Sequence, residues 1–415
     1  MKQRASDELS HGHRPQAHGP RTPVAARNSV AMCSKIAALS VIAALGLSIN
    51  AGCGDPLPSS RQITSTRVLA MKSEVIGPLF PETTPDAAVR CQALPFETVR
   101  LTPFIVDPSG PIAPQAIEPL YIACNLNASQ GLFGCLRSAM PTDLASIPEC
   151  PLPSFVDLDP EAETPAEPPS PCIVPADGSD DGLQDLTIPF ATTLIAGGDV
   201  EVTMIGHMES GPSTTACADM LLSGDTELPN DCIFAVQRVS VGPIEALLLL
   251  ASMFGIDLPA ELVGELPAPE DVPDGDRNPR IESFSASILR PDGSLTELGE
   301  LSPGDTITAA LGDVIQFTTI APESDLQTYP VQVNNGESTE DKNEAYDARW
   351  FVSWGELLSG TSDDPTSVND WSLTPRLDQE EPERPEGDVG TLFYVVRDGR
   401  QGVDWWWLRL VLSDE

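Results

Sequence analysis

An apolar run at residues 36–49, IAALSVIAALGLSI, decides in which compartment the rest of this 415-residue chain folds. Lys35 precedes the run and small residues follow it up to Cys53, which is the layout of an export signal. As a helix the run rises about 21 Å, which is too short for a bilayer core about 30 Å thick. We therefore expect residues 32–52 to be a signal peptide that directs export and is then removed.

Residues 50–53, NAGC, resemble a bacterial lipobox, in which small side chains admit the signal peptidase and the cysteine thiol receives diacylglycerol. Asn50 departs from that motif, where Leu is usual. The alternative, an ordinary signal peptide cut at a small-residue site, leaves Cys53 without a role, so we expect lipidation of Cys53. Gly54 follows it in place of Asp, which by enterobacterial sorting rules favours the outer membrane. The predicted location is the bacterial cell envelope, as an outer membrane lipoprotein on its periplasmic or its surface face.

The polar residues 1–31 lie ahead of a compact start at Met32. We expect Met32 to be the initiator, which makes residues 1–31 a misassigned start; the alternative is a disordered cytosolic extension. Residues 53–64 are short and polar, and are predicted to tether the ectodomain to its lipid.

Removal of residues 1–52 leaves 363 residues that carry 17 Lys and Arg against 60 Asp and Glu, a net charge of −43. Such a surface repels polyanions, which excludes nucleic acid as a partner and favours basic partners or divalent cations. The partners that we expect are the membrane, reached through the N-terminal lipid, and an unknown protein or glycan ligand.

Seven cysteines remain after Cys53, and all of them lie between residues 91 and 232. An oxidising envelope favours disulfides, and the odd number leaves one thiol unpaired. Spacing alone leaves every pairing open, and no C-x-x-C motif indicates zinc. We predict that neighbours in the sequence pair and that Cys91 is free, which gives the bridges Cys124–Cys135, Cys150–Cys172 and Cys217–Cys232.

Runs of β-branched and aromatic residues separated by turn residues predict an antiparallel sandwich over residues 65–242. Its expected strands are 66–75, 98–106, 120–124, 190–194, 200–208 and 232–241. Within it, the Pro- and acid-rich residues 151–188 form an excursion too poor in apolar side chains to fold alone.

Residues 243–279 are predicted to be a helix followed by an interdomain linker. Pro243 and Glu245 suit the first turn of a helix over residues 244–255. The helix is short and carries Glu245, so we expect it to pack on protein and not to cross a membrane.

Residues 280–415 hold all six Trp and no Cys, and they predict a second sandwich. Its expected strands are 281–289, 305–309, 314–320, 348–354, 391–396 and 404–412, with turns at 291–293 and 397–402. The expected fold is therefore mostly β: two immunoglobulin-like antiparallel β-sandwich domains joined by a short helix and linker.

Only one histidine, His207, remains after residues 1–52 are removed, and it lies in a strand without a nucleophile motif. Lys72 and Lys342 are the remaining lysines. Carboxylates are abundant but no pair stands out, so a carboxylate-based envelope hydrolase is an alternative only. We expect no catalytic residues and no enzymatic activity.

One acidic loop resembles the calcium loops of thrombospondin type 3 repeats and EF-hands, in which alternating oxygens converge on a hard cation. Ile188 stands where a bidentate Glu would complete such a loop, which favours a plain acidic turn and no cofactor. Calcium is the alternative, with the ligands Asp177, Ser179, Asp181 and Asp185.

Strand alternation divides the Trp cluster at residues 405–407 between two faces. Trp406 shares a face with Leu408, Leu410 and Leu412, and we expect that face to be core. Trp405 and Trp407 point the other way, and are predicted to form either an exposed binding surface or an interdomain contact. Trp350 and Trp354 resemble the core Trp of an immunoglobulin-like third strand.

Three segments carry a resemblance to a family: residues 67–70 (RVLA) after the lipobox, Asn278 with Pro279, and residues 395–405 (VVRDGRQGVDW). They resemble uncharacterised secreted lipoproteins of myxobacteria and their relatives, which have tandem immunoglobulin-like sandwiches. The resemblance implies a membrane-anchored envelope lipoprotein with a non-catalytic scaffold or binding role. A calcium-dependent adhesion module and the envelope hydrolase are the alternatives.

Overall fold

The computed structural model describes most of one compact unit, Pro58–Glu415. The described residues are 60–80, 88–126, 133–140, 142–152, 167–176, 181–195, 197–224, 228–253, 272, 274–333, 338–374 and 384–414. The predicted signal peptide, Met32, Cys53 and the first half of the tether lie outside them, as do parts of the acidic excursion.

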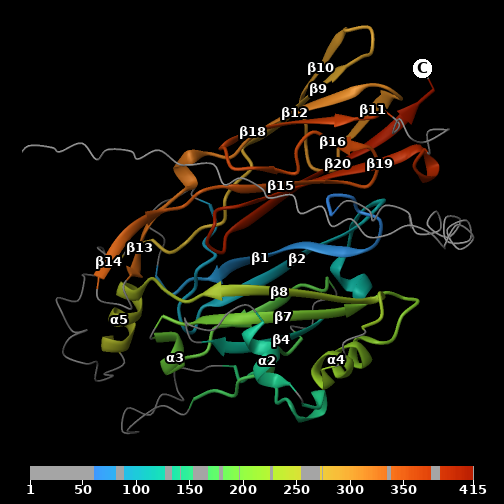
Figure 1. The fold of residues 1–415 in the computed structure, drawn as a ribbon. Coiled ribbons are helices and arrows are strands. Elements are labelled where there is room, and N and C mark those ends of the chain that lie inside the picture. Colours follow the sequence, from blue (N-terminus) through green and yellow to red (C-terminus); the bar gives the residue numbers. More distant parts are fainter. Residues whose placement is uncertain are drawn as a thin grey trace, which may run out of the picture. The chain divides into compact units, whose positions relative to one another are not determined.

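Two antiparallel sheets form the first sandwich (Figure 1). One has the order β1-β2-β3, with β6 also beside β2, and consists of β1 (Arg67–Gly77), β2 (Thr98–Asp107), β3 (Gly110–Ile112) and β6 (Gln184–Thr187). The other has the order β5-β4-β7-β8 and consists of β4 (Leu120–Leu126), β5 (Cys172–Ile173), β7 (Asp199–His207) and β8 (Cys232–Ser240). Their facing side chains form one core that includes Leu101, Ile105, Tyr121, Val202 and Met204.

Short helices flank this sandwich. They are α2 (Gly134–Ala139), α3 (Thr192–Ile195), α4 (Thr214–Ser223) and α5 (Ile244–Met253), with the 3-10 helices η1 (Pro114–Ile117) and η2 (Leu144–Ser146). Figure 1 shows α2 and α4 on the face of the β4–β7–β8 sheet that points away from β1 and β2. The predicted helix after Pro243 is confirmed, and its Ala246 and Leu247 enter the core. No helix of the described part has the length and the apolar content needed to cross a bilayer.

The strand predicted at residues 190–194 is wrong, because residues 192–195 form helix α3. The amide groups of Leu194 and Ile195 both donate to the carbonyl of Ala191, at 3.1 Å. Phe190 stacks on Phe96 with ring centroids 5.6 Å apart, and Leu194 is buried. Local backbone bonding and these two apolar anchors therefore override the β-branched composition of the segment.

Two five-stranded sheets form the second sandwich. One runs β10-β9-β12-β18-β16, with β9 (Ser283–Leu289), β10 (Leu295–Glu300), β12 (Val314–Ile320), β16 (Glu356–Leu357) and β18 (Thr366–Ser372). The other runs β11-β20-β19-β15-β17, with β11 (Thr306–Ala310), β15 (Asp347–Val352), β17 (Thr361–Ser362), β19 (Val389–Arg397) and β20 (Val403–Ser413). The hairpin β13 (Thr328–Val333) and β14 (Ser338–Asn343) and the 3-10 helices η5 (Glu323–Asp325) and η7 (Glu386–Asp388) complete it. Mostly β structure in two sandwiches is the fold class that the sequence predicts.

Strands β2 and β19 have buried side chains on both of their faces. In β2, Val99, Leu101 and Ile105 enter the first core, whereas Phe104 and Val106 point to the opposite face. That face packs against Phe393, Val395, Val403, Trp405 and Trp407 of β19 and β20. We call this shared apolar layer the junction. Residues of both sandwiches therefore form a third apolar core between them.

Polar contacts close the junction around this layer. Lys72 on β1 forms an ion pair of 2.7 Å with Asp404 on β20. Asn278 donates to the carbonyl of Ser73 at 2.8 Å and accepts from the amide of Val403 at 3.0 Å. Asp276, Arg277 and Asn278 are all buried. The end of the predicted linker is therefore a packed part of the junction.

The three predicted disulfides are confirmed, and Cys91 is free and buried. Cys124–Cys135 joins β4 to α2, and Cys217–Cys232 joins α4 to β8. Cys150–Cys172 closes the acidic excursion at β5. All three bridges tie flanking segments to one sheet, where α2 and α4 bury only a small apolar cluster.

Replacing Cys217 and Cys232 together by Ser removes a bridge across 15 residues. The unfolding free energy should fall by about 3 kcal/mol, because the unfolded chain regains the entropy of the closed loop. Urea denaturation measures this loss. Alkylation of the denatured, unreduced ectodomain should label Cys91 alone, and labelling of further cysteines would contradict the assigned bridges.

Candidate metal centre

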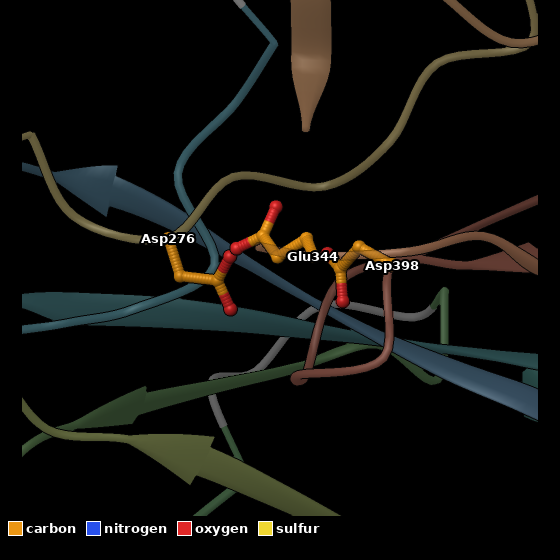
Figure 2. Close-up of side chains that lie close together, drawn as sticks. All are labelled: Asp276, Glu344 and Asp398. Carbon is orange, nitrogen blue, oxygen red and sulfur yellow. The ribbon is translucent and has the colours of Figure 1, made fainter. Parts of the chain in front are cut away.

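Three acidic side chains from distant parts of the sequence meet beside the junction. Asp276 lies in the segment between α5 and β9, Glu344 follows β14, and Asp398 follows β19. One carboxylate oxygen of each lies within 4.8 Å of the corresponding oxygens of the other two. Figure 2 shows the three side chains converging from separate segments of backbone. We call Asp276, Glu344 and Asp398 the acid cluster.

Backbone hydrogen bonds fix each of these segments. The amides of Cys91 and Gln92 donate to the Asp276 carbonyl at 2.8 and 3.1 Å, and the Ala345 amide donates to the Asp398 carbonyl at 3.1 Å. Gly402 lies against the Asp398 carboxylate, and a β-carbon at that position would occupy the place of its Oδ2. The turn after β19 therefore needs glycine there.

A buried ion pair holds the first-sandwich side of the cluster. Arg90 donates to Glu97 Oε1 at 2.7 Å, and the Leu94 amide donates to Glu97 Oε2 at 2.8 Å. These bonds shape residues 90–97, which place Cys91 and Gln92 against Asp276. The backbone of Asp276 and of Asp398 is thus held by hydrogen bonds within the protein.

Arg400 is the cation in contact with the acid cluster within the described residues. Its Nη1 lies 2.9 Å from Glu344 Oε1 and 3.4 Å from Asp276 Oδ1, and its backbone amide donates to Asp398 Oδ1 at 2.8 Å. Its guanidinium also lies over the ring of Tyr329, 4.3 Å from the centroid. One guanidinium against three carboxylates leaves an excess of two negative charges when all of them are ionised.

Several buried oxygens of the site receive no hydrogen bond from the described residues. They are Oδ2 of Asp276, Oδ2 of Asp398 and Oε1 of Gln327, whereas Oδ1 of Asp276 lies 3.4 Å from Arg400 Nη1. Gln327 belongs to the same site, because its backbone amide donates to Glu344 Oε2 at 2.8 Å and its Nε2 donates to the Gly275 carbonyl at 3.3 Å. Buried polar atoms are satisfied almost everywhere in folded proteins, so three such oxygens in one place indicate a missing positive partner.

Burial is also the main cause of the unusual acidities here. It raises the pKa of Glu344 to about 7, with the charge of Asp276 adding to the shift, and it raises the pKa of Asp398 to about 8, where Asp276 and Glu344 add. Burial and then Asp276 raise the pKa of the Cys91 thiol. The bare cluster therefore resists full ionisation at neutral pH, and a bound cation would oppose this effect.

Carboxylate and amide oxygens are hard ligands, which suit calcium or magnesium and not a soft metal. All three acids are buried, with at most 6% of any of them exposed. The arrangement can hold a cation or share protons, and its burial keeps a macromolecular substrate away from these carboxylates.

The predicted calcium loop is described only in part. Asp177 and Ser179 lie outside the described residues. Asp181 accepts from the Leu183 amide at 3.0 Å, and Asp185 forms a two-pronged ion pair with Arg100 on β2, at 2.9 and 3.0 Å. The Asp185 carboxylate thus has a partner in its own sheet, and calcium in this loop stays a prediction.

Trp405 and Trp407 are predicted to form either an exposed binding surface or an interdomain contact, and the structure shows the interdomain contact. Trp405 stacks on Phe104 with centroids 5.0 Å apart, and Lys72 Nζ lies 4.8 Å from its centroid. Trp407 packs in the same apolar cluster. On the other face, Trp406 packs against the second core and Trp350 is buried in it, as predicted.

His207 has a structural hydrogen bond. Its Nδ1 lies 2.9 Å from Thr214 Oγ1, and that hydroxyl donates to the Glu118 carbonyl at 2.8 Å. A hydroxyl has one hydrogen to donate, so His207 is the donor in the first bond. The imidazole therefore does not draw a proton from Thr214.

Sequence reasoning missed the acid cluster. Its members are separated by more than fifty residues, so they form no local spacing pattern. Only the three-dimensional contact of the linker with two loops of the second sandwich brings them together.

Comparisons with known proteins do not assign the chain to a family. No family model and no curated protein matches the chain. Among solved structures, the dimeric latent PorU from Porphyromonas gingivalis matches 85% of this chain and 34% of its own chain, with 9% identity and a TM-score of 0.19. The matched part is about a third of that chain's length.

Trp405→Ala should lower the unfolding free energy by about 2–3 kcal/mol, less than for a fully buried Trp, because it removes a half-buried indole that stacks on Phe104 in the junction. The matched control is Leu358→Ala, at a side chain that is 77% exposed, which should change stability by less than about 0.5 kcal/mol. Chemical denaturation measures both. Equal stability of Trp405→Ala and wild type would contradict the buried contact and restore the exposed binding surface.

Proposed function

We propose that this chain is a cell-envelope lipoprotein, held at a membrane by lipid on Cys53, whose ectodomain is a non-catalytic scaffold or binding unit. The observation that carries the proposal is the junction. The two sandwiches share an apolar layer and buried polar contacts, which suits a part that holds a ligand or partner at a fixed distance from its anchor.

Three disulfides support a location outside the cytoplasm, because reducing compartments do not maintain such bridges. They agree with the export signal that the sequence predicts. The outer membrane and the lipid itself rest on the sequence motif alone.

The surroundings of His207 and Lys72 support a non-catalytic role. His207 donates a hydrogen bond to the Thr214 hydroxyl. Lys72 forms an ion pair with Asp404, and its Nζ lies over the ring of Trp405. Both groups are engaged in structural contacts, so neither is poised as a general base or a nucleophile.

A second candidate is a calcium-dependent adhesion module, and the acid cluster is the observation that favours it. A cation there would control how firmly the two sandwiches are joined. In this case the scaffold would act on a partner only when the cation is bound.

Metabolic labelling with a radioactive fatty acid tests the anchor. Wild-type protein should incorporate the label and Cys53→Ser should lose it, because the thiol is the acceptor of the lipid. Cys33→Ser is the matched control and should keep the label, since residue 33 lies in the predicted signal peptide. Equal labelling of wild type and Cys53→Ser would contradict the proposal, and a hydrolase activity abolished by one Asp or Glu substitution would contradict the non-catalytic role.

A further inference from the structure

We propose that Asp276, Glu344 and Asp398 bind one calcium ion, with Gln327 as a neutral oxygen ligand, and that this ion fastens the two sandwiches to each other. The site differs from the calcium loop that the sequence predicts at residues 177–185. The proposal goes beyond the scaffold role and does not depend on the lipid anchor.

The charge of the site supports a divalent ion. When all three buried carboxylates are ionised, Arg400 offsets one of them, and the remaining two charges match one dication. Leaving charged groups buried without partners is costly, so the bare site retains protons, and a dication would replace them.

The unpaired oxygens provide the independent observation. Asp276 is fully buried, and its Oδ2 receives no hydrogen bond from the described residues, while its Oδ1 has Arg400 at 3.4 Å. Oδ2 of the buried Asp398 likewise receives no hydrogen bond from them. Gln327 directs its Nε2 to the Gly275 carbonyl, which leaves its Oε1 without a donor. These oxygens lie on the segments that border the cluster, where a cation would satisfy them together.

The ligand spacing fits calcium. Calcium–oxygen distances are about 2.3–2.6 Å, so two oxygens on opposite sides of the ion lie up to about 5 Å apart. The three carboxylate oxygens lie within 4.8 Å of one another. Magnesium binds at about 2.1 Å and keeps several of its waters, which suits a buried cluster with side chains from three loops less well.

The position of the ligands predicts the effect of the ion. Asp276 is bonded through its carbonyl to Cys91 and Gln92, which precede β2 in the first sandwich. Glu344 and Asp398 belong to loops of the second sandwich. A shared ion therefore connects the two sandwiches at the edge of the junction.

Calcium binding to the full mature protein, stripped with EDTA and dialysed, tests the proposal. Titration calorimetry with calcium chloride should show one site, and saturating calcium should raise the Tm by about 5 °C, an increase that EDTA reverses. Magnesium chloride should give a smaller increase. Asp398→Asn and Glu344→Gln should each weaken calcium binding at least tenfold, whereas Asp181→Asn, in the acidic loop, should bind as wild type does.

Hydrogen exchange on the wild-type protein locates the ion even where a variant fails to fold. Calcium should slow exchange in residues 274–280 and in residues 398–402. Absence of both heat and a Tm shift in the wild type would overturn the proposal. Binding that Asp181→Asn abolishes, with slowed exchange confined to residues 181–187, would assign calcium to the acidic loop and would overturn it equally.

Discussion

The stack of Phe104 on Trp405 and the apolar layer around it form the contact on which the rest of the structure depends. β2 and β20 can each serve two cores only because alternate side chains on them are apolar on both faces. Without this layer, Ala70, Phe104 and Val106 on one side and Phe393 and Val395 on the other would face water. Burying them makes a single ectodomain out of two sandwiches.

The polar groups at the edge of this layer determine how the connecting segment runs. Asn278 bonds to both sandwiches, and Asp276 is held by backbone amides of the first. This path places the Asp276 carboxylate in a fully buried position beside Glu344 and Asp398. Burying three carboxylates beside the junction lowers the stability of the fold, and the apolar layer of the junction offsets this loss. Binding sites typically carry such a loss of stability.

Periodicity in the sequence was sufficient to predict most of this fold. The long strands β1, β2, β7, β8, β9, β12, β19 and β20 follow alternating or continuous apolar runs, and the disulfides join neighbours in the sequence. β18 could not be found in this way. Its buried positions include Ser367 and Asn369, while Val368 is 68% exposed. Two hydrogen bonds with the backbone of Ser359 offset the cost of burying the Asn369 amide. The sequence pattern does not predict these bonds.

The role of Trp405 and Trp407 was open for a related reason. The alternation of side chains along the strand shows that both point away from the second core. It does not show whether water or protein covers them. The acid cluster was invisible because the sequence holds many carboxylates and none of the three has a characteristic neighbour. Long-range contacts alone select Asp276, Glu344 and Asp398.

Differential scanning calorimetry of the full mature protein tests most directly whether the junction unites the ectodomain. A common apolar layer predicts one transition, with a calorimetric enthalpy equal to the van't Hoff enthalpy. Two separate transitions, or a calorimetric enthalpy about twice the van't Hoff value, would show that the sandwiches unfold independently and would contradict the account.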